Sequence, residues 1–272
     1  VPWQSLPDGT VAFVAAEVPS LGYRTYAITA GGVSAKASAT QAPATALENR
    51  FYRITFDPAT GAITSILDKE LDVELVDQAA PHRFNEYLYE QFESHDWSIP
   101  TVWHRPSAAR LARSSGPVAE VMLVTASVKG VERLQQTVIL YHDLKRIDFV
   151  LDLVKSPSGR RDTIPASDPW GKESVYVALP LAVPEHQFRH ELPGCVAEPV
   201  ADLFEGACPA YYAVRHFSDV SNRSYGVTVS APDSSLIEYD HPRSCPIRAG
   251  GEAQFERTRT LPATSHMYLY LM

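Results

Sequence analysis

Two histidines and a neighbouring glutamate form the spacing closest to a metal site. His186 and His190 are four residues apart, and Glu191 follows the second histidine. A zinc-protease motif places its glutamate directly after the first histidine, on a helix. Pro184 and Pro193 flank the segment here and disfavour a helix. The spacing therefore favours a structural or site-rim role, and no His-x-Asp or His-x-His pair occurs in the chain.

Acidic residues gather among aromatic ones in the segment around Glu90. Glycoside hydrolysis needs two carboxyl groups about 5–9 Å apart across a sugar-binding cleft. Glu90, Glu93 and Asp96 lie close together in the sequence, beside Tyr87 and Trp97. Spacing alone does not define an acid and a nucleophile among them. A polar loop anchored by aromatic side chains is the favoured interpretation.

Nucleophilic catalysis finds little support in the sequence. The chain has no Gly-x-Ser-x-Gly sequence, the turn that exposes a catalytic serine. Its three cysteines, Cys195, Cys208 and Cys245, show no C-x-x-C spacing. Neither a disulfide framework nor a cysteine zinc site is therefore expected. We interpret the cysteines as small core residues.

Three clusters mix aromatic and polar side chains in stretches that we interpret as loops. They span residues 85–89 (NEYLY), 168–170 (DPW) and 189–191 (RHE). Loops carry many of the binding residues of proteins. Sugar rings stack on Tyr and Trp faces, and their hydroxyls pair with Asn, Asp, Glu and Arg. Each cluster alone is more typical of packing at a sandwich edge, so residue chemistry indicates a large all-β domain and leaves sugar binding open.

Composition excludes several classes of function. The 272 residues are 45% hydrophobic, which is enough for a substantial core. The net charge is −8 and no run of Lys or Arg exceeds two, so nucleic acid is not an expected partner. No apolar stretch approaches the roughly 20 residues that cross a bilayer, so no membrane partner is expected either. A neutral sugar is compatible with this acidic chain.

Period-two alternation predicts many antiparallel strands. Residues 51–56 and 62–67 flank the turn sequence DPATG and so predict a β-hairpin. Small residues dominate 31–46, which predicts a linker between a small β element at 1–30 and one large domain at 47–272. Without helical or βαβ periodicity, the pattern predicts a sandwich or barrel. Further strands are predicted at 118–129, 134–141, 146–154, 175–183, 211–217, 225–230 and 267–271.

Residues 47–69, LENRFYRITFDPATGAITSILDK, resemble the opening of the C-terminal domain of glycoside hydrolase family 38, the α-mannosidase family. In that family a Glu-Asn pair leads the first strand. An Asp-Pro…Thr-Gly hairpin and a Ser-Ile/Leu-x-Asp-Lys return follow it. Four more segments resemble the family in the right order, the last two its bacterial members: 21–26 (LGYRTY), 143–149 (DLKRIDF), 172–180 (KESVYVALP) and 219–228 (DVSNRSYGVT).

The resemblance implies an all-β fold, a large antiparallel supersandwich of the galactose-mutarotase type preceded by a small β-sandwich element. It implies a parent retaining α-mannosidase whose zinc ion and Asp nucleophile belong to an N-terminal catalytic domain. This chain is then expected to carry no cofactor, metal or catalytic residue of its own, to be a fragment at both ends, and to be inactive alone. The expected partners are that catalytic domain and a carbohydrate, an α-mannoside. The residues expected at the rim of the sugar pocket are Asn85, Tyr87, Arg189, His190 and Glu191.

Two other functions stay open on the sequence. A self-sufficient mutarotase or lyase on the same sandwich would use a histidine and a carboxylate as acid and base. His190 or His216 would then be the histidine. A plain carbohydrate-binding module would present a cleft of Trp and Tyr without an acid–base pair. A histidine paired with a glutamate across a concave sheet would favour the enzyme.

Overall fold

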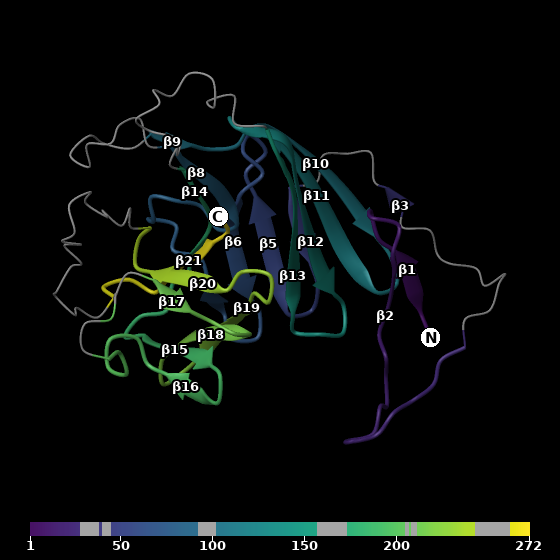
Figure 1. The fold of residues 1–272 in the computed structure, drawn as a ribbon. Helices are drawn as coiled ribbons and strands as arrows, with labels where there is room; N and C mark the ends of the chain where they lie inside the picture. The colour runs from purple at the N-terminus through teal and green to yellow at the C-terminus, as the bar shows by residue number, and fades with distance from the viewer. Residues whose placement is uncertain are drawn as a thin grey trace.

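The fold is built from β-strands. The computed structural model describes residues 1–27, 38–39, 45–91, 102–156, 173–204, 207, 211–242 and 262–272. Within these ranges every regular element is a strand, and the strands form antiparallel sheets of two, five, six, four and four strands (Figure 1). The predicted all-β class is confirmed. Several predictions lie outside the described residues, namely those on Glu93, Asp96, Asp168–Trp170, Cys208, Cys245 and most of the linker at 31–46.

The predicted hairpin forms the centre of a four-stranded sheet, in the order β4-β5-β6-β7. Asp57 begins its turn, because the carboxylate accepts hydrogen bonds from Ala59 N (2.8 Å) and Thr60 Oγ1 (2.9 Å). Gly61 ends the turn with a φ of 75°, and a Cβ there would lie 2.2 Å from Val124 Cγ1. Both backbone and packing therefore require glycine. The strands are β4 (Ala46–Glu48), β5 (Tyr52–Phe56), β6 (Ile63–Asp68) and β7 (Val73–Glu74).

A five-stranded sheet in the order β13-β12-β11-β10-β3 contains the longest strands. Three of them confirm strands predicted from alternation, whereas β10 was not predicted. In β13, Ile147 and Leu151 pack against the main core, and Asp148 lies on the other face, where it accepts a hydrogen bond from Tyr141 Oη (2.9 Å). The strands are β3 (Ser38–Ala39), β10 (Ser107–Ser115), β11 (Ala119–Ser127), β12 (Val131–Tyr141) and β13 (Ile147–Lys155).

A six-stranded sheet in the order β17-β20-β21-β14-β8-β9 corrects the prediction of a loop at 85–89. All of these residues except Asn85 belong to β8, a strand between two others, and Glu86 to Glu90 are buried throughout. A strand covered on both faces shows no alternation of polarity in its sequence, which is why β8 was interpreted as a loop. The strands are β8 (Glu86–Gln91), β9 (Val102–His104), β14 (Glu173–Pro180), β17 (Tyr212–Ala213), β20 (Leu236–Tyr239) and β21 (His266–Tyr270).

A second four-stranded sheet, in the order β16-β15-β18-β19, corrects two further predictions. Residues 189–191 are part of a strand rather than a loop, because His190 occupies a core position that hydrophobic residues usually fill. The single strand predicted at 211–217 is split, since the chain leaves the six-stranded sheet after β17 and enters this one at β18. The strands are β15 (Gln187–Leu192), β16 (Cys195–Ala197), β18 (Phe217–Ser221) and β19 (Gly226–Ser230).

One hydrophobic core joins four of the sheets. Each sheet turns buried apolar side chains into the same cluster, so the four pack as one unit. Among the described residues, no helix has the length and apolarity needed to cross a membrane. The core includes Ile54 and Ile66 from the hairpin sheet, Met122 and Val138 from the five-stranded sheet, Val177 and Met267 from the six-stranded sheet, and Phe188 and Val220 from the remaining sheet.

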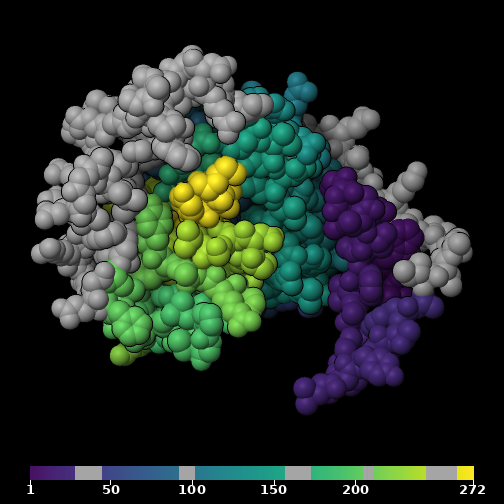
Figure 2. All heavy atoms as spheres, viewed as in Figure 1, coloured from purple at the N-terminus to yellow at the C-terminus, as the bar shows by residue number. Residues whose placement is uncertain are grey.

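The N-terminal hairpin lies on the outer face of the five-stranded sheet. Its strands, β1 (Trp3–Ser5) and β2 (Val11–Phe13), pair with one another. Gln4 is fully buried, and its Oε1 accepts hydrogen bonds from Val118 N (3.2 Å) and Ala119 N (3.0 Å). Figure 2 shows this purple segment against the teal surface of the sheet. Three apolar side chains of the segment complete the contact with β11 and β12: Leu6, Ala12 and Val14.

Candidate functional site

Strand β8 turns two carboxylates to one face of the six-stranded sheet. Side chains alternate along a strand, so Glu86 and Glu90 lie on one face and Tyr87 on the other. Tyr87 belongs to a hydrophobic cluster with Leu134 and Val175. Glu86 and Glu90 are only 3% and 0% exposed. Acidic side chains are rarely buried to this extent unless their surroundings are polar, which marks the face for closer description.

The neighbouring strands add aromatic and acidic side chains to the same face. Cross-strand pairing places Glu238 of β20 opposite Tyr268 of β21. On the other side, Trp103 of β9 lies opposite Glu90 of β8. Tyr176 of β14 lies between these two pairs. We call this set the polar face: Glu86, Glu90, Trp103, Tyr176, Glu238 and Tyr268.

The aromatic rings of the polar face are in contact with one another. The ring centroids of Trp103 and Tyr176 are 6.0 Å apart, and those of Tyr176 and Tyr270 are 5.3 Å apart. The His82 ring lies 5.8 Å from that of Tyr268 and 6.1 Å from that of Trp103. The rings therefore form a band across several strands. Tyr176 and Tyr268 are 0% exposed and pack in one cluster with Leu88 and Ala178.

Burial sets the ionisation of Glu86. Burial raises the pKa of this carboxyl, while the hydrogen bond from the Arg83 backbone amide and the charge of Arg105 lower it. Arg83 N donates a hydrogen bond to Glu86 Oε2 (2.7 Å), and Arg105 Nε lies 3.7 Å from Oε1. The pKa of Glu86 is thus raised by burial, and shifted pKa values are common at functional sites.

Two phenols of the polar face remain protonated at neutral pH. Burial raises the pKa of Tyr176, and the neighbouring Glu238 raises it further. Burial likewise raises the pKa of Tyr268. The Tyr268 hydroxyl is buried and makes no hydrogen bond to another described residue. It is therefore a protonated donor that protein groups in the described part of the chain leave unsatisfied.

His82 lies at one end of the polar face as a neutral imidazole. Burial lowers its pKa to about 4, and Arg105 and His266 contribute to the shift. The Arg105 guanidinium donates to Pro81 O (2.8 Å) and lies 2.9 Å from His82 Nδ1. Because arginine only donates hydrogen bonds, Nδ1 accepts and the ring proton is on Nε2.

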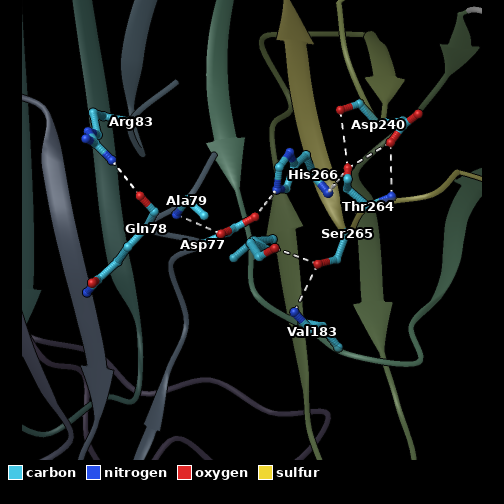
Figure 3. Close-up of polar contacts among 10 residues, drawn as sticks. Asp77, Gln78, Ala79, Arg83, Val183, Asp240, Thr264, Ser265 and His266 are labelled. Carbon is cyan, nitrogen blue, oxygen red and sulfur yellow. Dashed lines mark hydrogen bonds and ion pairs between the residues drawn. The ribbon is translucent and has the colours of Figure 1, made fainter. Parts of the chain in front are cut away.

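Hydrogen bonds fix the beginning of β21. His266 is buried, and its Nε2 lies 2.9 Å from Asp77 Oδ2. Asp77 also accepts a hydrogen bond from Ala79 N (2.9 Å). On the other side, Thr264 N and Oγ1 donate to Asp240 Oδ1 (3.0 and 2.9 Å). Figure 3 shows Asp77 and Asp240 on either side of the first residue of β21, His266. Their hydrogen bonds fix the strand two residues before Tyr268.

The first two predicted rim residues lie beside the polar face rather than on it. Asn85 precedes β8 with a φ of 58°, and its backbone oxygen accepts a hydrogen bond from Gln136 Nε2 (2.8 Å). Tyr87 is 0% exposed and faces the hydrophobic cluster. A shift of one residue along a strand changes the face, so it is Glu86, between Asn85 and Tyr87, that reaches the polar face.

The other three predicted rim residues lie on β15, in a different sheet. His190 is buried, and burial lowers its pKa. Arg189 Nε lies 3.5 Å from Glu198 Oε1. Glu191 Oε2 lies 3.0 Å from His216 Nδ1, and the His216 side chain is 56% exposed. The structure thus brings Glu191 together with His216, on a sheet other than that of Asn85 and Tyr87.

Sequence reasoning missed most of the polar face, although one signal was available. In residues 266–270 (HMYLY), every second residue is polar or aromatic and the others are apolar. That pattern places His266 and Tyr268 on one face and Met267 in the core. Within the described ranges, no three His, Cys, Asp or Glu side chains lie close enough together to hold a metal ion. The described groups of the polar face are suited to hydrogen bonding and stacking.

Comparison with known protein families identifies the class of this chain. The family described as "Glycosyl hydrolases family 38 C-terminal domain" matches residues 47–234. The match begins in β4 and includes β8, β9, β14 and the whole of the β15 sheet. The chain therefore belongs to the C-terminal domain family of family 38 glycosyl hydrolases, as its sequence predicted. No curated protein matches the sequence.

Membership places the chain in a glycoside hydrolase context. The family is one domain of larger hydrolases, which points to a catalytic domain as its partner. The sandwich would then be a component of the enzyme that works beside the catalytic machinery.

Proposed function

We propose that this domain packs beside the zinc-bearing catalytic domain of an α-mannosidase and that its polar face borders the sugar pocket. The observation that supports this is the concentration of buried carboxyl and phenol groups with a band of aromatic rings on one face of one sheet. Carbohydrate sites combine these two features, since stacking needs flat rings and hydroxyls need donors and acceptors.

The proposed role is to bind and orient the sugar. Zinc, bound in the catalytic domain, would polarise or hold the substrate at the reacting centre. The Tyr268 hydroxyl would donate a hydrogen bond to a sugar hydroxyl, and Glu86 would accept one. Trp103 and Tyr176 would limit access of water. None of these side chains is proposed as the acid or the nucleophile.

Hydroxyl deletions on the two faces of the six-stranded sheet test the proposal. Tyr268→Phe and Tyr87→Phe each remove one buried hydroxyl that no described residue bonds. In the protein that includes its catalytic domain, we expect Tyr268→Phe to lower kcat/KM for p-nitrophenyl α-mannoside about tenfold, because one hydrogen bond to substrate is lost. Tyr87→Phe should remain near wild type. The opposite order would place the sugar on the other face and contradict the proposal.

The His216–Glu191 pair supports a second candidate function, acid–base chemistry by the domain itself. The two side chains are 3.0 Å apart, and such a pair would serve a mutarotase-like reaction. The pair lies away from the polar face, on β15 and just before β18. Polarimetry of fresh α-galactose with the chain, and with His216→Gln, tests this candidate. Mutarotation that the substitution abolishes would support it, and unaccelerated mutarotation would remove it.

A further inference from the structure

An open hollow lies where the six-stranded sheet meets the ends of β10 and β11. Its volume is about 330 Å³, a size suited to a small molecule. None of the described residues that line it is acidic, and two of them are cationic, although the chain has a net charge of −8. The hollow is lined by Trp103, His104, Arg105, Ser107, Ser127, Val128 and Lys129.

The backbone around the hollow departs from regular strand geometry. The register of β10 shifts between Ser107 and Arg110, and Ala108 adopts a φ of 51°. A left-handed conformation is strained at a residue other than glycine, and bulges of this kind often lie next to binding sites. Across the hollow, Gly130 has a φ of 77°. A Cβ at Gly130 would lie 3.0 Å from the Tyr89 ring, so this turn is packed tightly.

The cations of the hollow are held in place mainly by neutral groups. Lys129 Nζ donates to Gln91 Oε1 (3.0 Å), and His104 Nε2 lies 3.3 Å from the same oxygen. Arg105 donates to Pro81 O, and among the described residues its nearest carboxylate is Glu86, 3.7 Å away. The described residues therefore neutralise this positive charge only partly. The Trp103 indole lies beside these cations and supplies an apolar wall.

We propose that this hollow binds a monosaccharide that carries an anionic group, either a carboxylate or a phosphate. Lys129 and Arg105 would hold the anion through charge-assisted hydrogen bonds. Ser107 and Ser127 would pair with sugar hydroxyls, and Trp103 would contact the apolar face of the ring. The site adjoins the polar face, because Trp103 belongs to both, but it does not depend on the function proposed for that face.

The test observes the Trp103 indole directly. The chain has four tryptophans, so a ¹⁵N-tryptophan-labelled sample gives four indole signals, and Trp103→Phe identifies one of them. The ligands are glucuronate, glucose 6-phosphate, glucose and inorganic phosphate, titrated at low salt. We expect glucuronate, glucose 6-phosphate or both to shift the Trp103 signal with a Kd of about 1 mM or tighter. Glucose should bind about tenfold more weakly, since it lacks the anion.

Charge-matched variants complete the test. Lys129→Gln should weaken binding about fivefold. Arg133→Gln removes one positive charge from an exposed pair with Asp152, outside the hollow, and should leave binding unchanged. Three results would overturn the proposal: no saturable shift with either acidic sugar, equal weakening by both variants, or glucose binding as tightly as the acidic sugars. Inorganic phosphate binding as tightly as glucose 6-phosphate would also overturn it, because the sugar would then contribute nothing.

Discussion

Asn49 shows that the residues of the family signature act by fixing the hairpin sheet. Its Oδ1 accepts hydrogen bonds from Phe51 N (2.8 Å) and Tyr52 N (2.6 Å), and its Nδ2 donates to Tyr141 O (2.6 Å). Asn49 therefore connects the start of the hairpin to the five-stranded sheet. Lys69, at the return of the hairpin, donates to Asn49 O (2.8 Å). These contacts are structural, so the fold itself accounts for this part of the family signature.

Substitution of Asn49 should be costly for stability. Asn49→Ala leaves two amides and one carbonyl without their partner at a site that is 8% exposed. We expect the free energy of unfolding to fall by about 2–3 kcal/mol, measured by urea denaturation. Asn222 is a matched control, because it bonds Ser224 N, Tyr225 N and Pro184 O in the same way at a more exposed turn. Asn222→Ala should cost about 1 kcal/mol, and equal losses would contradict this account.

His82 should make the domain sensitive to acid. Its pKa is about 4 in the folded chain and 6.5 in the unfolded chain, so the unfolded chain binds more protons between these values. Stability should therefore fall as the pH drops from 6.5 to 4. His82→Asn should remove about 1–2 kcal/mol of this loss, a figure reduced because the ring is only partly buried. Urea midpoints at neutral pH and near pH 4 measure it, with the exposed His216→Asn as control. An unchanged pH dependence in His82→Asn would show that another group is responsible.

At the scale of elements, alternation and turn chemistry in the sequence predict several strands correctly but miss β8 and β10. The hairpin and β11–β13 show clear alternation or turn chemistry, and the structure confirms them. Strand β8 was missed because Glu86 and Glu90 are charged but buried, so its polarity does not alternate. The polar face could not be predicted for a related reason, since it depends on register between β8, β14 and β21. That register is set by long-range packing.

The N-terminal hairpin depends on one buried glutamine and one glycine. A Cβ on Gly116 would lie 2.3 Å from Gln4 Oε1, so Gly116→Ala should displace the glutamine. We expect Gln4→Ala and Gly116→Ala each to reduce the hydrogen-exchange protection of the Val118 and Ala119 amides by about 2 kcal/mol.

The double variant separates this contact from a general loss of stability. Once Gln4 is alanine, Gly116→Ala should cost little more, because the clash is gone. Additive losses would mean that the two residues act independently. Gln78→Ala, at an exposed position, serves as the control for substitution of a glutamine and should leave both amides protected.

At the scale of the whole molecule, apolar side chains remain exposed along the N-terminal segment after β2. Leu21 is 108% exposed and Tyr23 is 86% exposed. Clusters of exposed apolar residues mark interaction surfaces. We expect chymotrypsin to cleave after Tyr23 in this chain and cleavage to slow at least tenfold when the catalytic domain is present. Equal cleavage rates would show that the catalytic domain does not cover this segment.

The most direct test compares hydrolysis of p-nitrophenyl α-mannoside by this chain alone and by the chain joined to its catalytic domain, both with added zinc. The account predicts turnover only in the joined protein, because it assigns the zinc ion and the reacting groups to the catalytic domain. Activity of the joined protein with an inactive 272-residue chain would support a β-domain that depends on its partner. Zinc-dependent turnover by the chain alone would contradict the account, and the His186 and His190 pair would then be the first residues to substitute.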